Sequence, residues 1–550
     1  MTTKHGTGPV NKQEDSKNGH NTSPNHHQHQ HQSTPNNHQQ ESPPMYTLPH
    51  YPLWGSCRLV FTLCAFLTTT NLILMRFNLS FALVCMVKGK EINGTLDKWL
   101  PKEGDANFTR VRQPGCYALE ESDGGAVSLY DMAEFDWSKE LQGRLLSGFF
   151  YGYIVSQAFG GWFSDKFGGK LFFVLGNLLQ SICTLLMPVA ARLHPEMLFV
   201  LRIIQGIVCG LCLPAMYVLF AKWASPAERT KLMGVAYTGF PLANVIIFPL
   251  ASTLCQTGID GGWPMIFYVT GGFGTLCSIV YYFVVFDDAD SHPRIAPGER
   301  RYLNSVIART NNKKMIVPWG SIIKSVPVHA YNVAHFCQTW AFVTLAINLP
   351  MLMKEVLYFD LKANGLLSAL PYICALIMRI AIAYLFKPVQ DFLGLSITNM
   401  RKMNHLIGTI IPGISILCIA LLSCEQKYLA VFLIMLTAMF TDIAFTGSYL
   451  LSYLELAPRF AGLLTGISNT IGSMPGVITN TLVGYITTNG TPEEWMVVIY
   501  IMSGMYFLGG LFYAFFGSSE LQEWAKDCED DLNVKRFMSK MEKLEINNQD

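Results

Sequence analysis

Charged residues are scarce in this sequence. Asp, Glu, Lys and Arg make up 14% of the 550 residues, against roughly 25% in soluble domains, and half of the residues are hydrophobic. The formal net charge is +1, so the sequence lacks the positive excess that nucleic-acid binding requires. Apolar runs of about 20 residues, long enough to cross a bilayer, fill the region between a polar beginning and a charged end. These features predict an integral membrane protein that does not bind nucleic acid.

Catalytic signatures are missing as well. The apolar runs contain no nucleophile–base cluster, no phosphate-binding glycine loop and no metal-ligand spacing. We therefore expect no enzyme, no catalytic residue, no cofactor and no metal site within these runs. No secretory signal precedes the first apolar run, near Leu59, so that run is expected to direct membrane insertion.

The 14 cysteines do not form the pattern of a disulfide framework. Most of them lie inside apolar runs, as Cys183, Cys277 and Cys374 do, where a cysteine behaves as a small buried hydrophobe. Cys116 and Cys424 lie between such runs, and a disulfide between these two is an open alternative. Most of the cysteines are thus predicted to be free and buried.

The beginning of the chain is a low-complexity segment. Residues 25–40 read NHHQHQHQSTPNNHQQ, a composition that cannot bury a hydrophobic core. We expect residues 1–57 to be a disordered cytosolic tail. A metal-binding tail is the alternative, since imidazole binds zinc or copper.

The apolar runs define an organisation in two halves. Twelve runs are predicted to span the membrane, at residues 58–87, 141–162, 171–191, 197–220, 232–256, 265–286, 326–353, 361–386, 403–423, 428–450, 460–486 and 495–516. The predicted fold is therefore an all-α membrane protein with twelve transmembrane helices in two six-helix bundles. The predicted parts are an N-terminal bundle 58–286 with an insert 88–140, a central linker 287–325, a C-terminal bundle 326–516 and a charged tail 517–550.

Positive charge predicts the orientation. Lys and Arg concentrate in the loops on the side of both termini and the linker, which predicts that this side is cytosolic. The insert then faces the lumen or the exterior. It carries two sequons, at Asn93 and Asn107, which we expect to be glycosylated.

Two bundles joined by a linker are typical of transporters that rock around a site at the membrane midplane. Small residues recur every fourth position from Gly148 to Gly160, which lets helices approach closely. Asp165 and Lys166 follow in a short turn, where an aspartate is favoured near the N-terminus of the next helix. We expect these two residues, with Glu455 and Arg459, to form a cytosolic gate between the bundles.

The stretch GGWFSDKFGGK, residues 160–170, resembles the cytosolic loop signature of the major facilitator superfamily. Five further stretches narrow the resemblance, namely MRFNLSFALVCMV (75–87), VLRIIQGIVCGLCLPAMYVLFAKWASPAERTKL (200–232), HFCQTWAF (335–342), YLELAPRFAGLLTGISNTIGSMPG (453–476) and SELQEWA (519–525). They are similar to the organic-anion branch that includes sialin, the vesicular glutamate transporters and phosphate transporters. The likeness runs from about Leu53 to Ala525 and is greater to sialin than to the glutamate carriers.

The resemblance implies roles for two arginines within the apolar runs. Arg76 and Arg202 match positions where the family keeps arginine, and are expected to face a central cavity and attract the substrate anion. A guanidinium group suits this role because it stays charged and binds carboxylate or phosphate through two parallel bonds. The alternative for Arg202 is an end-of-helix residue that snorkels to the interface. Asn78, Tyr217 and Gln338 are further candidates for substrate binding.

The coupling ion is left open by departures from the family. Gln205 and Cys209 share a helix face with Arg202 and stand where sialin has acids, so proton coupling does not carry over directly. Arg379 and Asp442 are charges well inside apolar runs. Asp442 is predicted to bind the coupling cation or to pair with an arginine across the cavity, and a locally satisfied structural pair is the alternative. His335 is the second candidate for the coupling ion, with a packing role as its alternative.

We therefore predict a secondary active transporter of small anions, such as sialate, an acidic amino acid or inorganic phosphate, that works by alternating access. Protons, sodium or the membrane potential would drive it. A non-transporting anion sensor or scaffold is the alternative. We expect a monomer in a vesicular, lysosomal or plasma membrane.

Overall fold

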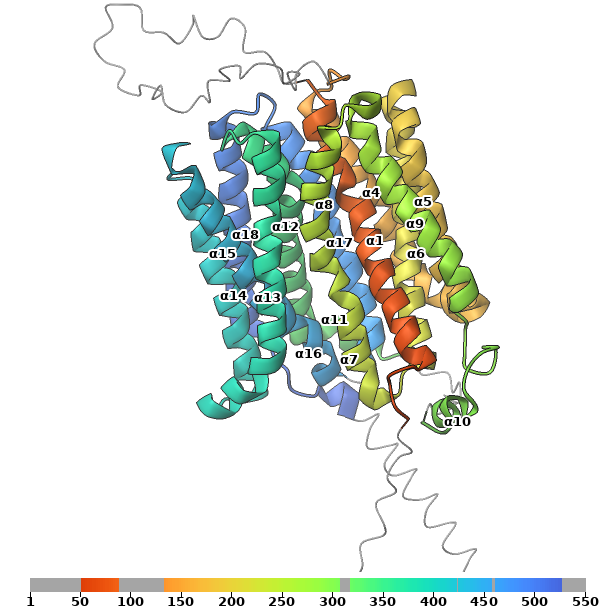
Figure 1. Cartoon of the computed structure of the whole chain (residues 1–550). Coiled ribbons are helices and arrows are strands. Elements are labelled where there is room, and N and C mark those ends of the chain that lie inside the picture. The colour runs from red at the N-terminus through yellow and green to blue at the C-terminus, as the bar shows by residue number, and fades with distance from the viewer. Residues whose placement is uncertain (1–50, 89–132, 307–316, 423, 458–459, 527–550) are drawn as a thin grey trace, which may run out of the picture. The chain divides into compact units, whose positions relative to one another are not determined.

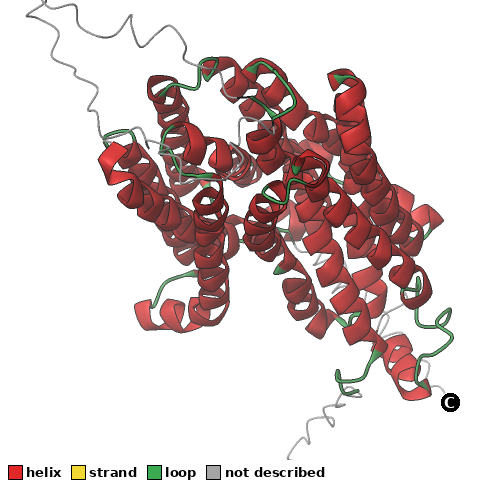
Figure 2. Ribbon diagram, turned by 45° about the horizontal axis from the view of Figure 1, so that its top comes forward, coloured by secondary structure: helices red, strands yellow, loops and turns green. Residues whose placement is uncertain are grey.

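The computed structural model describes residues 51–88, 133–306, 317–422, 424–457 and 460–526. The sequons at Asn93 and Asn107, Cys116, Arg459 and the two terminal tails lie outside these residues. Within the described residues the regular elements are helices, apart from a single bridge between Val87 and Phe135 (Figure 2).

The helices fall into two groups, which we call the N-half and the C-half (Figure 1). The N-half consists of α1 (Cys57–Met86), α4 (Lys139–Phe167), α5 (Gly169–Leu193), α6 (Pro195–Trp223), α7 (Pro226–Tyr237), α8 (Gly239–Cys255), η2 (Ile259–Gly261) and α9 (Trp263–Val284). The linker carries α10 (Pro297–Val306) and α11 (Trp319–Lys324). The C-half consists of α12 (Val326–Glu355), α13 (Leu361–Leu393), α14 (Ile397–Ile419), η3 (Cys424–Gln426), α15 (Lys427–Ala444), the π-helix η4 (Phe445–Tyr449), α16 (Leu450–Leu456), α17 (Ala461–Ile486) and α18 (Pro492–Phe516).

Ten described helices are long and apolar enough to cross a membrane. The predicted spans 141–162 and 460–486 correspond to α4 and α17, which have 29 and 26 residues but are not among the ten. Both helices are rich in glycine and serine, and α17 in threonine as well, which lowers their hydropathy without shortening them. Small residues of this kind belong to helix–helix contacts rather than to surfaces that face lipid.

The two ends of the helices have different neighbours. We call the end at which Val87 and Phe135 lie the insert end, because these residues flank the insert. The opposite end, where α10 lies in Figure 1, is the linker end. Glu299 of α10 accepts hydrogen bonds from the first backbone amides of α1, at Cys57 (3.0 Å) and Arg58 (3.1 Å). Arg58 is fully buried and also pairs with Glu228 at 2.6 Å, so the linker is anchored to the start of α1.

The halves meet through α1 and α12, α4 and α17, and α8 and α13. The described hydrogen bonds that join them all lie toward the insert end. Ser252 donates to the Leu361 carbonyl at 2.8 Å and Lys354 to the Val84 carbonyl at 3.0 Å. Two more pairs, Ser80 with the Ile347 carbonyl and Lys139 with Glu355, complete the set. Among the described residues, no hydrogen bond joins the halves near the linker end.

A disulfide between Cys85 and Cys255 corrects the expectation for these two cysteines. They lie in the last turns of α1 and α8, at the insert end, and are 170 residues apart in sequence. Cys183, Cys277 and Cys374 are free, as expected. Sequence spacing does not reveal the pair, because it depends on α1 packing beside α8.

Candidate functional site

Arg76 lies in α1 within a group of aromatic side chains from α4. Its guanidinium carbon is 4.5 Å from the centre of the Phe150 ring, 5.1 Å from that of Phe149 and 5.5 Å from that of Tyr153. The faces of aromatic rings attract a cation. The Nε atom of Arg76 is buried without a hydrogen-bond partner, and no carboxylate of the described residues pairs with this arginine. Its positive charge is therefore held by rings and not by an acid.

Arg202 has a different environment from the one expected. It is only 1% exposed, and its Nη atoms donate to the carbonyl oxygens of Met75 at 3.3 Å and Arg76 at 3.0 Å. Gln205 donates to the same Met75 carbonyl and accepts from Arg202 at 2.8 Å. Arg202 thus contacts the backbone of α1 at the residue that carries the aromatic-bound guanidinium, and this geometry favours a positioning role for it.

Glycines explain why α4 and α6 come close enough to build this arrangement. A Cβ atom at Gly206 would collide with the carbonyl oxygen of Phe149, and one at Gly152 with that of Ile203. The close approach leaves the Phe149 ring between two guanidinium groups, 5.1 Å from that of Arg76 and 5.4 Å from that of Arg202. The stripe of small residues from Gly148 to Gly160 therefore lies against α6, within the N-half.

No acid balances the two arginines. Cys209, one of the positions where the resemblance led us to look for an acid, is buried on α6 near Arg76. It presents a thiol there, and Gln205 presents an amide to Arg202. The interior of the N-half therefore holds two like charges and no described carboxylate partner, an arrangement that attracts an anion.

The C-half holds a buried ion pair. Asp442 of α15 pairs with Arg379 of α13 at 2.6 Å, and their side chains are 6% and 21% exposed. The arginine belongs to the same half and does not lie across the cavity, so the geometry is that of the alternative considered for Asp442, a locally satisfied pair. Gln338 of α12 donates to the neighbouring Thr441 carbonyl at 3.0 Å, so it lies beside this pair rather than beside Arg76.

His335, the second candidate for the coupling ion, also belongs to the C-half. Its Nδ1 atom bonds the Ser468 hydroxyl at 2.8 Å, and its ring lies 5.1 Å from that of Tyr449. A Cβ atom at Gly472 would contact the imidazole, so this glycine makes room for it. The structure thus brings His335, Gln338 and Asp442 into one half and leaves Arg76 in the other.

Two further candidates for substrate binding make no described contact with the guanidinium of Arg76. Asn78 is fully buried and donates to Thr270 of α9 at 3.3 Å. Tyr217 is 40% exposed, and its ring lies 5.9 Å from that of Tyr237. Sequence reasoning missed Tyr153, which lies close to the guanidinium of Arg76. The signal was present, because Phe149, Phe150 and Tyr153 are spaced for one side of a helix.

The predicted gate residues lie at the linker end. Asp165 is exposed and has no hydrogen-bond partner among the described residues, while Lys166 lies over the Trp162 ring at 4.9 Å. The N-terminus of α5 is taken by Asp287, which accepts from the Lys170 amide at 2.9 Å. Glu455 pairs with Arg401 of its own half at 2.5 Å. Their role as a gate between the halves remains a prediction.

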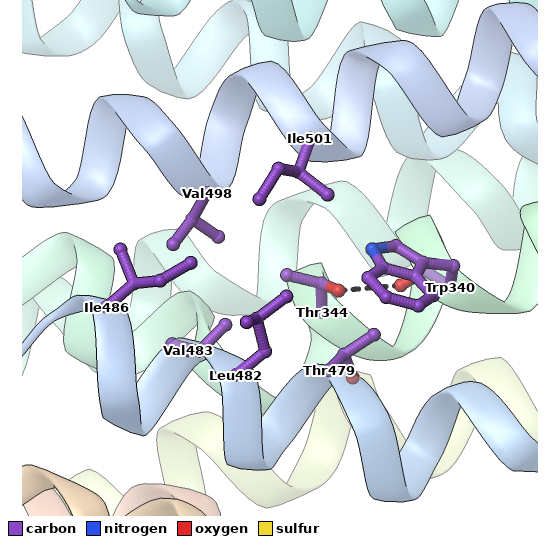
Figure 3. Close-up of a pocket in the computed structure, with 8 residues that line it drawn as sticks. All are labelled: Trp340, Thr344, Thr479, Leu482, Val483, Ile486, Val498 and Ile501. Atoms are coloured by element: carbon purple, nitrogen blue, oxygen red, sulfur yellow. Dashed lines mark hydrogen bonds between the residues drawn. The ribbon is translucent and has the colours of Figure 1, made fainter.

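A small cavity lies between α12, α17 and α18 (Figure 3). Its volume is about 10 Å³, which is close to the space for one water molecule. It is lined by Trp340, Thr344, Thr479, Leu482, Val483, Ile486, Val498 and Ile501. The side chains are mostly apolar, and the Thr344 hydroxyl is already bonded to the Trp340 carbonyl. This cavity is too small for an organic anion and contains none of the predicted site residues.

Comparisons with known proteins agree with the resemblance. Residues 124–478 match the sequence model of the Major Facilitator Superfamily. Sialin of Homo sapiens is 32% identical over 481 residues, which cover 86% of this chain and 92% of sialin. Vesicular glutamate transporter 1 of Xenopus tropicalis is 34% identical over 414 residues, 74% of this chain and 70% of that protein. A putative inorganic phosphate cotransporter of Drosophila ananassae is 33% identical, covering 85% and 94%.

Solved structures support the same fold. A D-xylose-proton symporter superposes with a TM-score of 0.59 at 13% identity, covering 84% of this chain and 99% of that one. A bacterial homologue of the human lysosomal transporter Spinster, in an inward-facing and occupied conformation, gives 0.57 at 12% identity, covering 83% and 96%. At such identities the likeness concerns the fold alone.

Proposed function

Because the chain belongs to the major facilitator superfamily, and is a transporter rather than an enzyme, we propose that it carries small anions across a membrane by alternating access. Its relatives include proteins named as carriers of glutamate and of inorganic phosphate, so carboxylates and phosphate are the substrate classes that we put forward. The relatives do not favour the alternative of a non-transporting sensor.

The observation that carries this proposal is the pair of arginines inside the N-half. A charge inside a protein is costly unless it is paired, and neither arginine has a carboxylate partner among the described residues. The Nε atoms of both arginines are buried without a partner. The Nη atoms of Arg202 are engaged with carbonyl oxygens and with Gln205, whereas the guanidinium of Arg76 lies against rings and makes no hydrogen bond within the described residues. Arg76 is therefore the group to which the anion binds, and Arg202 positions it.

The membrane topology is part of the proposal. We include α4 and α17 as spans, which gives twelve, and we place both termini and the linker in the cytosol. The disulfide supports this orientation, because disulfides persist in oxidising compartments and Cys85–Cys255 lies at the insert end. The insert, with its sequons at Asn93 and Asn107, then faces the lumen or exterior. The likeness to sialin and the glutamate carriers supports a lysosomal or vesicular membrane.

Alternating access requires a second arrangement of the halves. In the described structure their hydrogen bonds lie toward the insert end. In the other arrangement these contacts open, and Asp165, Lys166, Glu455 and Arg459 close the linker end. Protons, sodium and the membrane potential are the driving forces to be compared.

Uptake into proteoliposomes tests the proposal. Labelled sialate, glutamate, aspartate and phosphate are offered under a proton gradient, a sodium gradient and a membrane potential. We expect uptake of at least one anion, and its loss in Arg76→Gln. The matched control is Arg144→Gln, which removes an exposed arginine of the same half that pairs with Glu196. Folded protein without uptake of any anion would contradict a carrier of these substrates.

A further inference from the structure

A short π-helical segment follows α15 inside the C-half. Residues Phe445–Tyr449 are wound as the π-helix η4, and Ser448 has non-helical backbone angles, φ −130° and ψ −106°. Arg401 and Asn404 of α14 each donate a hydrogen bond of 3.1 Å to the Gly447 carbonyl within it. Single π-helical turns inside α-helices are frequently found at functional sites. Two side chains of a neighbouring helix stabilise this interruption, so it is a specific feature of the fold.

Asp442 lies one turn before the interruption and is satisfied on one side only. Its Oδ1 atom accepts both bonds from Arg379, from Nη2 at 2.6 Å and from Nε at 3.2 Å. Its Oδ2 atom is buried and has no partner in the described structure. An arginine–carboxylate pair commonly uses both oxygens in two parallel bonds. The Oδ2 atom of Asp442 is therefore a buried acceptor that lacks a hydrogen-bond donor.

More unpartnered polar atoms lie in η4, which follows this carboxylate in sequence. The hydroxyl groups of Thr446, Ser448 and Tyr449 are buried without partners among the described residues. Arg379 of α13 pairs with Asp442, and Tyr449 of η4 lies near it. The rings of His335 from α12 and His405 from α14 lie 5.1 Å and 6.1 Å from that of Tyr449. Tyr506 from α18 bonds the hydroxyl of the neighbouring Thr441 at 2.7 Å. Arg379 is the positive charge in contact with Asp442, and it disfavours a metal cation there. A proton on Oδ2 has no such conflict, because it neutralises the carboxylate.

We propose that Arg379 is a second anion-binding arginine, which Asp442 occupies as an internal counter-ion until it is protonated. A hydronium ion gives its proton to Oδ2 of Asp442 and leaves as water. The resulting carboxylic acid no longer holds Arg379 by charge, and Nε and Nη2 pass their hydrogen bonds to a carboxylate or phosphate oxygen of the substrate. One proton and one negative charge thus bind together. The side chain of Arg379 is 21% exposed and that of Asp442 6%, so the guanidinium is the less buried partner of the pair.

This inference rests on the proposed function but has its own test. Asp442→Asn mimics the protonated acid, so we expect it to bind glutamate or phosphate several-fold more tightly than wild type at pH 7.5. Wild-type KM for uptake should fall several-fold between pH 7.5 and pH 5.5, whereas the KM of Asp442→Asn should not change, and the variant should carry no protons with the anion. The control Asp391→Asn removes a carboxylate from an exposed pair, Lys387–Asp391, and should behave as wild type.

A charge-exchanged variant separates this role from a structural one. Arg379→Asp combined with Asp442→Arg should restore the melting temperature that Arg379→Gln lowers, but not uptake. Uptake by the exchanged variant, or wild-type KM and proton movement in Asp442→Asn, would overturn the inference. If the wild type shows no uptake, melting temperatures measured with and without the anion still test the inference. Phosphate or glutamate should stabilise Asp442→Asn more than wild type and lose that effect when Arg379→Gln is added, and equal stabilisation would overturn the inference.

Discussion

In the N-half, the buried Arg202 and the partly buried Arg76 have no carboxylate partner among the described residues, whereas in the C-half Arg379 is held by Asp442. The first arrangement uses aromatic rings and carbonyl oxygens, which attract a cation but do not neutralise it. The second neutralises the charge within the protein. Under our proposal, Arg76 of the N-half can therefore bind a substrate anion directly. Arg379 of the C-half can do so only after its bonds to the Asp442 carboxylate are broken.

The difference also separates binding from positioning. Arg76 and Arg202 both match family positions, yet the Nη atoms of Arg202 donate to the backbone of α1, whereas the guanidinium of Arg76 makes no hydrogen bond within the described residues and lies against rings. The hydrogen bond from Arg202 fixes the α1 backbone at Arg76, and this keeps the guanidinium of Arg76 against the rings of α4. Substitutions that add, remove or move charge in either half test whether this division of roles is correct.

Placing an acid beside Arg76 should have the largest effect. Cys209→Asp makes the N-half resemble the C-half, because the new carboxylate competes with the substrate for the guanidinium. With an effective dielectric constant near 20, we expect anion affinity at pH 7.5 to fall on the order of 10–100-fold. The control Cys209→Asn has nearly the same shape without the charge, so it should stay close to wild type in the same binding assay. Equal losses in the two variants would mean that shape, not charge, is responsible.

Removal of the disulfide should lower stability by a smaller amount. Cys85→Ser with Cys255→Ser frees the ends of α1 and α8, and the loss of a disulfide typically costs about 2–4 kcal/mol in the free energy of unfolding. The readout is the melting temperature in detergent, with Cys183→Ser as the control at a free cysteine. Because α1 carries Arg76, we expect anion affinity to fall as well. Wild-type melting behaviour in the double variant would contradict the account.

Loss of the positioning arginine comes next. Arg202→Gln removes the guanidinium bonds to the carbonyl oxygens of Met75 and Arg76, and hydrogen bonds to charged groups contribute about 1.5–3 kcal/mol. We expect a lower melting temperature together with weaker anion binding. Arg76→Gln should weaken binding without a comparable loss of stability. The reverse pattern, with stability lost at Arg76 and retained at Arg202, would exchange the roles of the two residues.

A contact between the halves gives the smallest predicted effect. A Cβ atom at Gly476 of α17 would collide with the Phe150 ring, which lies against Arg76. Overpacking of this kind costs about 1–3 kcal/mol, so Gly476→Ala should slow uptake several-fold. Gly466→Ala is the matched control, because it lies in the same helix and faces open space. Equal uptake by the two variants would show that the contact does not matter for transport.

Much of the helical organisation could be predicted from the sequence, because apolar runs of sufficient length have few other uses. Ten of the helices are long and apolar enough to span a membrane. α4 and α17 have lower hydropathy because they contain many small residues, and several of their glycines contact other helices. Arg76 could be proposed from its depth and its family position. The contacts of the Arg202 side chain could not be predicted. Periodicity shows on which face of the helix a residue lies, but it does not show which carbonyl oxygen accepts a hydrogen bond from its side chain.

The remaining features depend on contacts between distant residues. Arg379 and Asp442 are 63 residues apart, and no local pattern specifies that they meet. The π-helix at Phe445–Tyr449 could not be predicted from the sequence either, because it is stabilised by hydrogen bonds from Arg401 and Asn404 of another helix. The sequence therefore reveals which charges are buried in each half, whereas the packing decides which of them are paired.

Equilibrium binding of labelled glutamate and phosphate to the purified protein at pH 7.5 tests the central claim most directly. Wild type, Arg76→Gln and Arg144→Gln are compared. Removal of one partner of a buried charge pair costs about 2–5 kcal/mol, so Arg76→Gln should lose at least about 30-fold in affinity, while Arg144→Gln should remain within about twofold of wild type. An Arg76→Gln variant that binds as tightly as wild type would contradict the claim that the N-half holds its anion at this arginine.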